Sequence, residues 1–353
     1  MDTNAFFTQI NQLSDKVKNS QLPPDLLEKV NTMLNLLKAT SGQSQSMVSF
    51  ESISNYINWV LAIPFSTETK DTLDLNHAKD VLDKNHYGLD EVKNRIIEYL
   101  ASIILMLQKS DSDSVIRAPI ICLVGLVGTG KTTLAYSIAQ ALGRDFQRIP
   151  FGGMGDVRQL RGQSRAFADA EPGYIIKKLV NAKSRNPVIL LDELDRVTDQ
   201  ARADIMGALV ELLDPEQNKA FTDHYIDYPV DLSHVLFIAT ANNTTNVATA
   251  VLDRLEIIQM PSYSDQEKTI IAKTYLFPKI LAQTGLSSQN LVISDEVWPL
   301  IIRPLGFDSG IRSLERSIEG ICRKVARIIV EGKLPQNGVI NLTPQNIKEF
   351  LPI

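Results

Sequence analysis

The sequence predicts an α/β protein whose core is a parallel five-stranded sheet around a phosphate-binding loop. The first sign is the segment 125–132, of pattern G-x-x-x-x-G-K-T, which follows an apolar run and precedes a helical pattern. The second is the apolar run 188–191, which ends in two acidic residues. Short apolar runs alternate with helical patterns from about residue 75 to residue 261, as in a sheet covered by helices on both faces. The expected strands are 120–124, 146–149, 188–191, 235–239 and 256–260.

The loop at 125–132 has the residue types that bind nucleotide phosphates. Its glycines let successive backbone N–H groups turn toward phosphate oxygens, Lys131 reaches the β- and γ-phosphates, and Thr132 offers a hydroxyl to Mg²⁺. The following helix adds the positive end of its dipole, and Gly143 stands where its C-terminal cap is expected. The expected phosphate-binding residues are Gly125, Gly128, Thr129, Gly130, Lys131, Thr132 and Thr133.

The acids that follow the run 188–191 supply the second half of a nucleotide-hydrolysing site. Asp192 is expected beside the Mg²⁺ ion, and Glu193 is expected to act as the base for the attacking water. The alternative is a core strand that runs into a solvated acidic turn. Because nucleotide hydrolysis needs both a phosphate loop and such acids, and the chain has both, the residues predict an ATPase that uses ATP and Mg²⁺.

Three more polar residues are candidates for contact with the γ-phosphate. Asn242 follows the strand at 235–239, which would place its amide beside the attacking water. Arg254 precedes the last strand, and Arg312 begins a long helix; planar cations suit the charge that develops on a transferred phosphoryl group. Taken alone, an asparagine here is typical of a turn, and arginines at helix ends are mostly solvated.

Composition limits the other functions of the chain. Its 353 residues, 44% of them hydrophobic, are enough for two or three domains. The net charge of −5 lacks the basic excess of a dedicated nucleic-acid binder. Cys122 and Cys322 lie in apolar patterns and are expected to be reduced core residues, and the four histidines show no zinc-ligand spacing. With neither a signal peptide nor a stretch of about 20 apolar residues, a cytoplasmic protein without a membrane partner is expected.

Four segments are expected along the chain. Residues 1–40 form a helical hairpin, and residues 41–74 hold a flexible polar joint and a further helix that ends at Pro64. Residues 75–261 form the nucleotide-binding domain. Residues 262–353 form a small, mostly α-helical lid domain. In the lid, short β segments at 291–293 and 339–342 are candidates to pair, and Thr343 and Pro344 are expected to open the last helix as N-cap and first-turn proline.

Several of these segments together resemble one family, the AAA+ module of Lon-type ATP-dependent proteases. The segment 213–225, which contains LDPEQN and FTDHY, is highly specific to that family. The resemblance covers residues 45–353, and the first 40 residues resemble the helical arm that precedes this module. The segments that carry it are 85–89, 95–101, the phosphate loop, 190–195, 213–218, 221–225, 239–242 and 321–326.

The resemblance assigns a role to each candidate residue. It implies that Lys131 and Thr132 bind phosphate and Mg²⁺, that Asp192 supports the metal, and that Glu193 activates water. It further implies a ring-shaped homo-hexamer, because the family's arginine finger acts on ATP held by the neighbouring subunit. The remaining matches are Asn242 as first sensor, Arg254 as arginine finger, Arg312 as second sensor, and Tyr87 with Gly88 around the adenine.

The chain departs from the family pattern in three places. Leu126 and Val127 replace two prolines of the phosphate loop, which is not expected to prevent binding. The substrate-gripping pore loop keeps an aromatic residue, Phe167, but its aliphatic neighbour is reduced to Ala168; the alternative for Phe167 is simple packing in the core. No segment provides the setting of the family's Ser–Lys peptidase dyad, so the chain is a fragment, a stand-alone ATPase or one half of a split machine.

The leading function is therefore ATP hydrolysis that drives protein unfolding in a Lon-like machine for protein quality control. The expected partners are further copies of the chain, unfolded protein substrates and a separate peptidase domain or subunit. A nucleotide-gated scaffold that does not thread substrate is the alternative, consistent with Ala168. A DNA-remodelling protein is a third class; the net charge and the segment 213–225 disfavour it, although Lon-type proteins as a family can associate with DNA.

Overall fold

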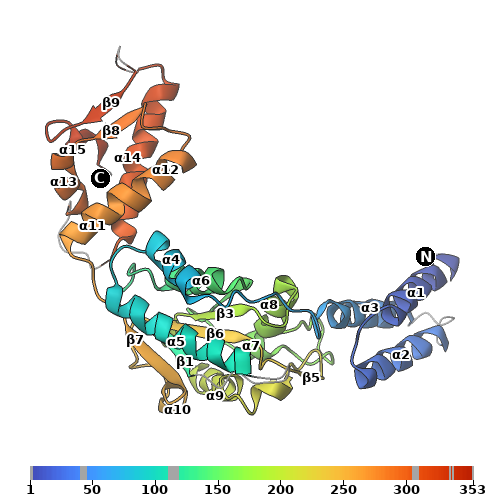
Figure 1. Ribbon diagram of the computed structural model, residues 1–353. Coiled ribbons are helices and arrows are strands. Elements are labelled where there is room, and N and C mark those ends of the chain that lie inside the picture. The colour runs from blue at the N-terminus through green and yellow to red at the C-terminus, as the bar shows by residue number, and fades with distance from the viewer. Residues whose placement is uncertain are drawn as a thin grey trace.

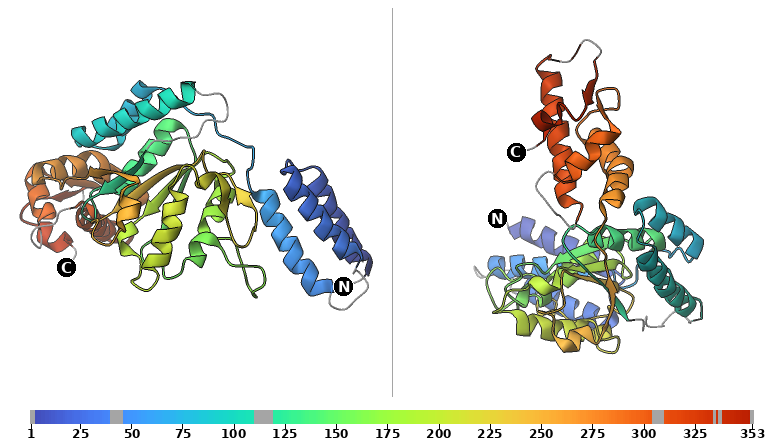
Figure 2. Two further views of the ribbon diagram at one scale, coloured as in Figure 1. Left: turned by 90° about the horizontal axis from the view of Figure 1, so that it is seen from below. Right: turned by 90° about the vertical axis from the view of Figure 1, so that its left-hand side faces the viewer.

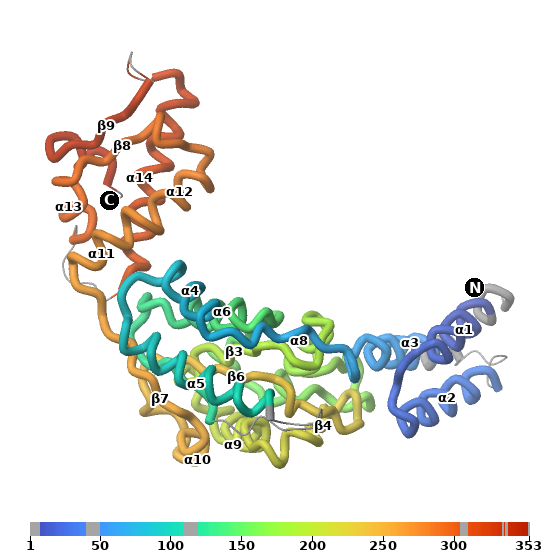
Figure 3. Tube along the Cα trace, in the orientation of Figure 1, coloured from blue at the N-terminus to red at the C-terminus, as the bar shows by residue number. Residues whose placement is uncertain are grey.

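The computed structural model describes residues 3–39, 46–109, 119–303, 310–333, 335 and 338–351. It has three parts in chain order: N-terminal helices, a central α/β part, and a mainly helical C-terminal part that stands beyond one end of the sheet (Figure 1). The Cα trace in Figure 3 shows the chain passing through them in that order. The polar joint expected at 40–46 lies outside the described residues, apart from Ser46.

The central sheet has five strands, all parallel, in the order β2-β3-β6-β1-β7. This confirms the predicted fold class. The three central strands are buried along their whole length, which explains their continuous apolar runs. The strands are β1 (Ile120–Val124), β2 (Phe146–Pro150), β3 (Val188–Asp192), β6 (Leu236–Ala241) and β7 (Leu255–Gln259).

Alternate residues of each strand enter two separate hydrophobic clusters, one on each face of the sheet. In β1, Ile121 and Leu123 face one cluster, and Ile120, Cys122 and Val124 face the other. The first cluster also holds α4 (Leu75–Asn85), α5 (Asp90–Lys109) and α6 (Lys131–Leu142). The second holds α8 (Tyr174–Ala182) and α9 (Arg202–Leu212).

Shorter elements connect these layers. A short antiparallel pair, β4 with β5, lies outside the main sheet, after α9. These elements are α7 (Arg158–Arg161), α10 (Thr249–Leu252), β4 (Phe221–Thr222), β5 (Pro229–Val230), and the 3₁₀ turns Leu194–Arg196 and Asn218–Ala220.

The N-terminal part contains the predicted helical hairpin and one further helix. These are α1 (Thr3–Lys18), α2 (Pro24–Ala39) and α3 (Ser46–Ala62), and Figure 2 shows them projecting sideways from the α/β part. Buried residues of the hairpin, such as Val17 and Val30, belong to one apolar cluster with Tyr56 and Val60 of α3 and with a face of the central sheet. The N-terminal helices are therefore anchored on the core through α3.

The segment between α3 and α4 is fixed to the back of the core. Its backbone exchanges hydrogen bonds with core loops, from Thr72 N–H to the Leu142 oxygen at 2.9 Å and from Arg185 N–H to the Thr67 oxygen at 2.7 Å. Arg144 forms a two-pronged pair with Asp71, with N···O distances of 2.7 and 2.6 Å. Both partners of this pair are largely buried, so removal of either one would leave an uncompensated buried charge.

The C-terminal part packs around the long helix α14 (Arg312–Val330), whose buried side chains include Ile318, Ile321 and Val325. The expected β segments pair in parallel as β8 (Leu291–Ile293) and β9 (Ile340–Leu342). The other elements are α11 (Asp265–Ile271), a π-helical turn (Ala272–Leu276), α12 (Phe277–Gln283), a 3₁₀ turn (Asp295–Val297), α13 (Trp298–Ile302) and α15 (Ile347–Phe350).

The expected start of the last helix is wrong. Helix α15 begins at Ile347, and Thr343 is not its N-cap. Instead, the Thr343 N–H donates to Asn346 Oδ1 at 2.9 Å, and the Asn346 amide donates to the Asn341 oxygen at 2.9 Å. The Asn346 side chain thus stabilises a turn after β9, and this turn delays the helix by one turn of chain.

The cysteine prediction agrees with the structure, since Cys122 and Cys322 are both free and buried. Burial raises the pKa of the Cys122 thiol to about 12 and that of Cys322 to about 11. Within the described residues, no helix combines the length and apolarity that a membrane crossing requires.

Candidate nucleotide-binding site

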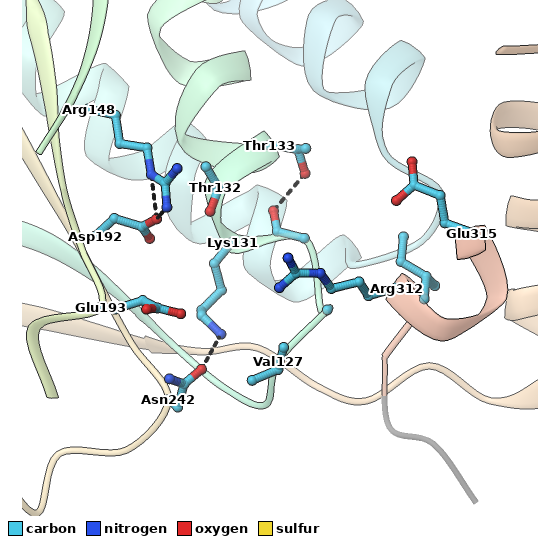
Figure 4. A pocket seen from close by; sticks show the side chains of 13 residues that line it. Val127, Lys131, Thr132, Thr133, Arg148, Asp192, Glu193, Asn242, Arg312 and Glu315 are labelled. Carbon is cyan, nitrogen blue, oxygen red and sulfur yellow. Dashed lines mark hydrogen bonds and ion pairs between the residues drawn. The ribbon is translucent and has the colours of Figure 1, made fainter. Parts of the chain in front are cut away.

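A pocket of about 270 Å³ lies where the carboxyl ends of β3 and β6 meet the first turn of α6 and the beginning of α14. In Figure 4, Lys131, Asp192, Glu193 and Asn242 come from the core, and Arg312 faces them from the C-terminal part. Most of the predicted polar site residues therefore converge on one space. The lining residues are Val127, Gly128, Gly130, Lys131, Thr132, Thr133, Arg148, Asp192, Glu193, Asn242, Ile311, Arg312 and Glu315.

Two glycines of the phosphate loop are required by its backbone. Gly130 has φ of 90° and directly precedes α6, a conformation that other residues rarely adopt. A Cβ on Gly125 would lie 2.7 Å from both the Cβ and the oxygen of Met260, so the loop must pass β7 without a side chain. The predicted C-cap is also present, because Gly143 has φ of 70° and its N–H bonds back to α6.

Lys131 is buried, and its ammonium group is hydrogen-bonded to backbone oxygens of the phosphate loop. It donates to the oxygens of Gly125 at 2.6 Å and Leu126 at 3.0 Å, and to Asn242 Oδ1 at 3.2 Å. Burial lowers the pKa of Lys131, and the carboxylates of Asp192, Asp195 and Glu193 act in the opposite direction.

The two acids at the end of β3 are oriented by one hydroxyl. Thr240, fully buried on β6, donates its hydroxyl to Asp192 Oδ1 and accepts the Glu193 N–H at 2.9 Å. The second Asp192 oxygen accepts from Arg148 Nε at 2.7 Å. Glu193 has φ of 61°, a left-handed conformation that turns its side chain away from the strand direction and into the pocket.

Arg148, Thr240 and Asp195 were missed by the sequence analysis. Asp195 accepts the Asn242 N–H at 3.0 Å and its side-chain amide at 3.4 Å, and so fixes the candidate sensor. Two signals were available in the sequence: Arg148 lies inside the expected strand 146–149, and Thr240 lies at the end of a buried strand. Polar groups at such positions need hydrogen-bond partners.

The C-terminal part touches the phosphate loop directly. The Ile311 N–H donates to the Gly128 oxygen at 3.0 Å. A Cβ on Gly310 would lie 2.3 Å from the Val127 oxygen, so only glycine allows this approach. Arg312 directly follows Ile311 and consequently lines the pocket.

A second pocket of about 450 Å³ adjoins the first and shares Gly130, Thr133 and Ile311 with it. Four tyrosines contribute to its wall: Tyr87, Tyr136, Tyr263 and Tyr275. Its size and aromatic lining suit a flat heteroaromatic base next to the phosphate loop. Gly88, expected here as well, is not among the lining residues; it has φ of 62° and lies beside Glu267.

His86 is one of the residues that line the second pocket. Its Nε2 lies 2.9 Å from the Ser137 hydroxyl, and the residue is buried. Burial, with Lys93 nearby, lowers the pKa of His86 to about 4, so the ring is neutral at pH 7.

Seven predicted residues do not line the first pocket. Gly125, Tyr87 and Gly88 are described above, and the others are Thr129, Arg254, Phe167 and Ala168. The Thr129 side chain is fully buried and donates to the Leu126 oxygen at 2.9 Å, so its hydroxyl faces the loop interior. Arg254 instead pairs with Asp214 at 3.1 Å and donates to the Ala250 oxygen at 2.7 Å. Phe167 is 61% exposed, and Ala168 is exposed too, which excludes packing of Phe167 in the core of this chain.

Comparison with known families agrees with this geometry. Residues 121–263 match the ATPase family associated with various cellular activities (AAA). Residues 282–337 match the Lon protease AAA+ ATPase lid domain. The chain is thus an AAA+ ATPase, with a nucleotide-binding domain followed by a lid, and its fold and site agree with ATP binding.

Whole-chain comparison narrows the class. The chain is 41% identical over 345 residues to the Lon protease of Lawsonia intracellularis, covering 98% of this chain and 40% of that protein. It is 42% identical over 344 residues to the Lon protease of Bacillus thuringiensis and to Lon protease 1 of Bacillus subtilis, covering 97% of this chain and 42% and 43% of those proteins. Within the AAA+ class, the chain thus combines an AAA domain with a Lon-type lid and is similar to Lon proteases along nearly its whole length, while it spans about two fifths of these relatives' length.

The state of His86 predicts a pH dependence of folding. Well above pH 6.5 the His86 ring is neutral in both the folded and the unfolded chain. As the pH falls from 6.5 toward 4, the unfolded chain takes up a proton that the folded chain does not, and the free energy of unfolding drops by up to about 3 kcal/mol. In urea titrations at pH 7 and 4.5, His86→Gln should lack most of this drop, whereas the variant of the exposed His77, His77→Gln, should retain it. Equal drops in both variants would contradict the assignment.

Proposed function

We propose that this chain hydrolyses Mg²⁺-bound ATP to drive protein unfolding, as the motor of a Lon-like ATP-dependent protease that works as a cytoplasmic hexameric ring. The observation that carries the proposal is the convergence of Lys131, Asp192, Glu193 and Asn242 from the core, and Arg312 from the lid, on one pocket. Peptidase activity is assigned to a domain or subunit outside these residues. Two buried cysteines that form no disulfide support the proposed location.

The residues in the pocket fit a magnesium ion held with the nucleotide. Thr132 and Asp192 offer a hydroxyl and a carboxylate, and within the described ranges there is no cluster of three or more acidic, histidine or cysteine ligands. Mg²⁺ in such sites is bound by one or two protein oxygens and by the phosphates. When bound, it neutralises charge on the β- and γ-phosphates. Lys131 then binds phosphate, Glu193 orients and deprotonates water, and Asn242 holds that water in line.

Arg254 is proposed to act on the ATP of a neighbouring subunit. It lies at the turn between α10 and β7, outside its own pocket, and Asp214 holds its guanidinium group. An arginine that cannot serve its own site in this position is suited to a site formed between subunits. This is the physical basis for proposing a ring.

Phe167 is proposed to contact the unfolded substrate. It lies between α7 and α8 on an exposed segment, where its ring can bury apolar side chains of a passing chain without reading their sequence. One observation favours a scaffold that does not thread protein: the neighbour of Phe167 is Ala168, whose methyl group adds little contact area.

Substitutions at Lys131 and Glu193 separate binding from hydrolysis. Lys131→Ala should weaken ATP binding by at least about tenfold, because a charge-assisted hydrogen bond to phosphate is lost. Glu193→Gln should retain ATP binding but slow turnover by about 10²- to 10⁴-fold, because the base is removed. Fluorescent-nucleotide titration and phosphate-release assays measure the two effects. Equal loss of binding in both variants would refute the role given to Glu193.

Mixed rings test whether Arg254 acts between subunits. Arg254→Ala should bind ATP and lose about 10³-fold in turnover, as arginine fingers do. Mixing it with Glu193→Gln subunits should restore part of the phosphate release, because some interfaces then combine an intact Glu193 with an intact Arg254. If mixed rings are shown to form and no activity returns, the arginine does not act across the interface.

Phe167→Ala tests the threading of substrate. In the wild type, an unfolded protein such as casein should raise ATP hydrolysis above the basal rate, and in the variant the ratio of the two rates should fall to about 1, because the contact of the ring with the chain is lost. Thermal melts of both proteins serve as the control for folding. A wild type that casein never stimulates would favour the scaffold.

A further inference from the structure

A turn at residues 223–227 links three parts of the molecule that are far apart in sequence. Its first residue, Asp223, is fully buried and accepts three backbone N–H groups, from Tyr225 at 2.8 Å, Ile226 at 3.1 Å and Gly173 at 2.7 Å. The first two bonds shape the turn itself. The third reaches the start of α8, where the segment that bears Phe167 ends.

Both ends of the segment 162–173, here named the Phe167 loop, meet at Asp223. A Cβ on Gly162 would lie 2.6 Å from Asp223 Oδ1, and a Cβ on Gly173 would lie 2.5 Å from the Gly162 nitrogen. Two glycines and one carboxylate thus form a tight base for the loop. Across this base, the Gln163 N–H donates to the Glu171 oxygen at 3.2 Å.

The N-terminal helices hold the same turn from the other side. Tyr56 of α3 is fully buried, and its hydroxyl donates to the Ile226 oxygen at 3.1 Å. Lys29 of α2 donates to the Asp227 backbone oxygen at 2.7 Å and to its carboxylate at 2.9 Å. Figure 1 shows α3 meeting the core on the side where β5 lies.

Arg165 joins the loop to the helices directly. Its guanidinium carbon lies 4.0 Å from the centre of the Tyr56 ring, and the group is 3.9 Å from the Asp227 carboxylate. A planar cation stacked on a buried ring is well held, because the ring cannot move without α3. A single residue, Ala166, separates Arg165 from the exposed Phe167. The other limb of the loop is tied to α8 by the pair of Glu171 with Lys177 at 2.5 Å.

We propose that Arg165 is a positioning residue: by stacking on Tyr56, and with the turn 223–227 as its support, it couples the position of the N-terminal helices to that of the Phe167 loop. A displacement of α3 then moves the contact residue for substrate, so the helices set how strongly an unfolded chain stimulates ATP hydrolysis. The inference rests on the proposed contact of Phe167 with substrate for its effect on hydrolysis. The mechanical link itself stands on the described contacts alone.

A double-mutant cycle in the 353-residue chain tests the effect on hydrolysis. Arg165→Gln and Tyr56→Leu should each lower the ratio of casein-stimulated to basal ATP hydrolysis by about two- to fivefold, as expected for a cation–π contact. The double variant should be no lower than either single one, because both remove the same contact. Arg165→Lys and Tyr56→Phe keep a cation and a ring, and should retain most of the ratio. Arg158→Gln, at an exposed arginine outside the loop, is the matched control. Additive losses would overturn the proposal.

A second measurement does not depend on substrate. Because Cys122 and Cys322 are buried, a cysteine at the exposed Ala166 can be labelled selectively with a thiol fluorophore. In the Ala166→Cys background, Arg165→Gln should lower the fluorescence anisotropy of the probe, and adding Tyr56→Leu should lower it no further. Thermal melts check that Tyr56→Leu folds; if it does not, Arg165→Gln compared with Arg165→Lys decides. Unchanged anisotropy in Arg165→Gln would overturn the link, whereas a wild type without casein stimulation but with this change would refute only the threading function.

Discussion

The site depends on the parallel register of β3, β6 and β1. Leu191 lies opposite Ala239, and Leu123 lies opposite Thr240, so the three strands end at one edge of the sheet. A one-residue slip of β6 would turn Thr240 to the opposite face and leave Asp192 and Glu193 without their shared hydroxyl. These strands are apolar on both faces, and their side chains pack in the two hydrophobic clusters. The register is therefore held by packing away from the pocket.

Charge at this edge is arranged around a single buried cation. Lys131 is surrounded by Asp192, Glu193 and Asp195, but its hydrogen bonds go to backbone oxygens and an amide. Asp192 accepts from Thr240 and Arg148, and Asp195 accepts from the Asn242 N–H. Asp192 pairs with Arg148, and Glu193 lies 3.4 Å from Arg196, whereas the hydrogen bonds of Lys131 go to uncharged oxygens. Such an arrangement keeps the charge of Lys131 available to an anionic ligand.

The sequence was sufficient for what depends on local pattern and insufficient for what depends on distant partners. The five strands, the phosphate loop and the acids 192 and 193 follow from periodicity and spacing, and the structure has them in place. Thr240, Arg148 and Asp195 act through contacts between elements far apart in the sequence, which the pattern of one segment does not reveal. The late start of α15 is of the same kind, because the Asn346 side chain competes with the expected cap.

The helices at the N-terminus illustrate the limit most clearly. Their apolar periodicity predicts three helices, but not the place where they dock. That place is set by Tyr56 and Lys29, which bind a turn about 170 and 198 residues further along the chain. The apolar pattern within one helix carries no information about a partner so far along the chain. The folded structure brings these partners together.

The contact between the lid and the phosphate loop is made by backbone atoms, from the Ile311 N–H to the Gly128 oxygen. Exchange of side chains leaves such a bond in place, so an alanine scan of the lid would pass over it. Gly310 is the exception, because any side chain there meets the Val127 oxygen. The contact between the lid and the phosphate loop therefore tolerates most substitutions. Gly310, which has no side chain, is the residue whose replacement would disturb it.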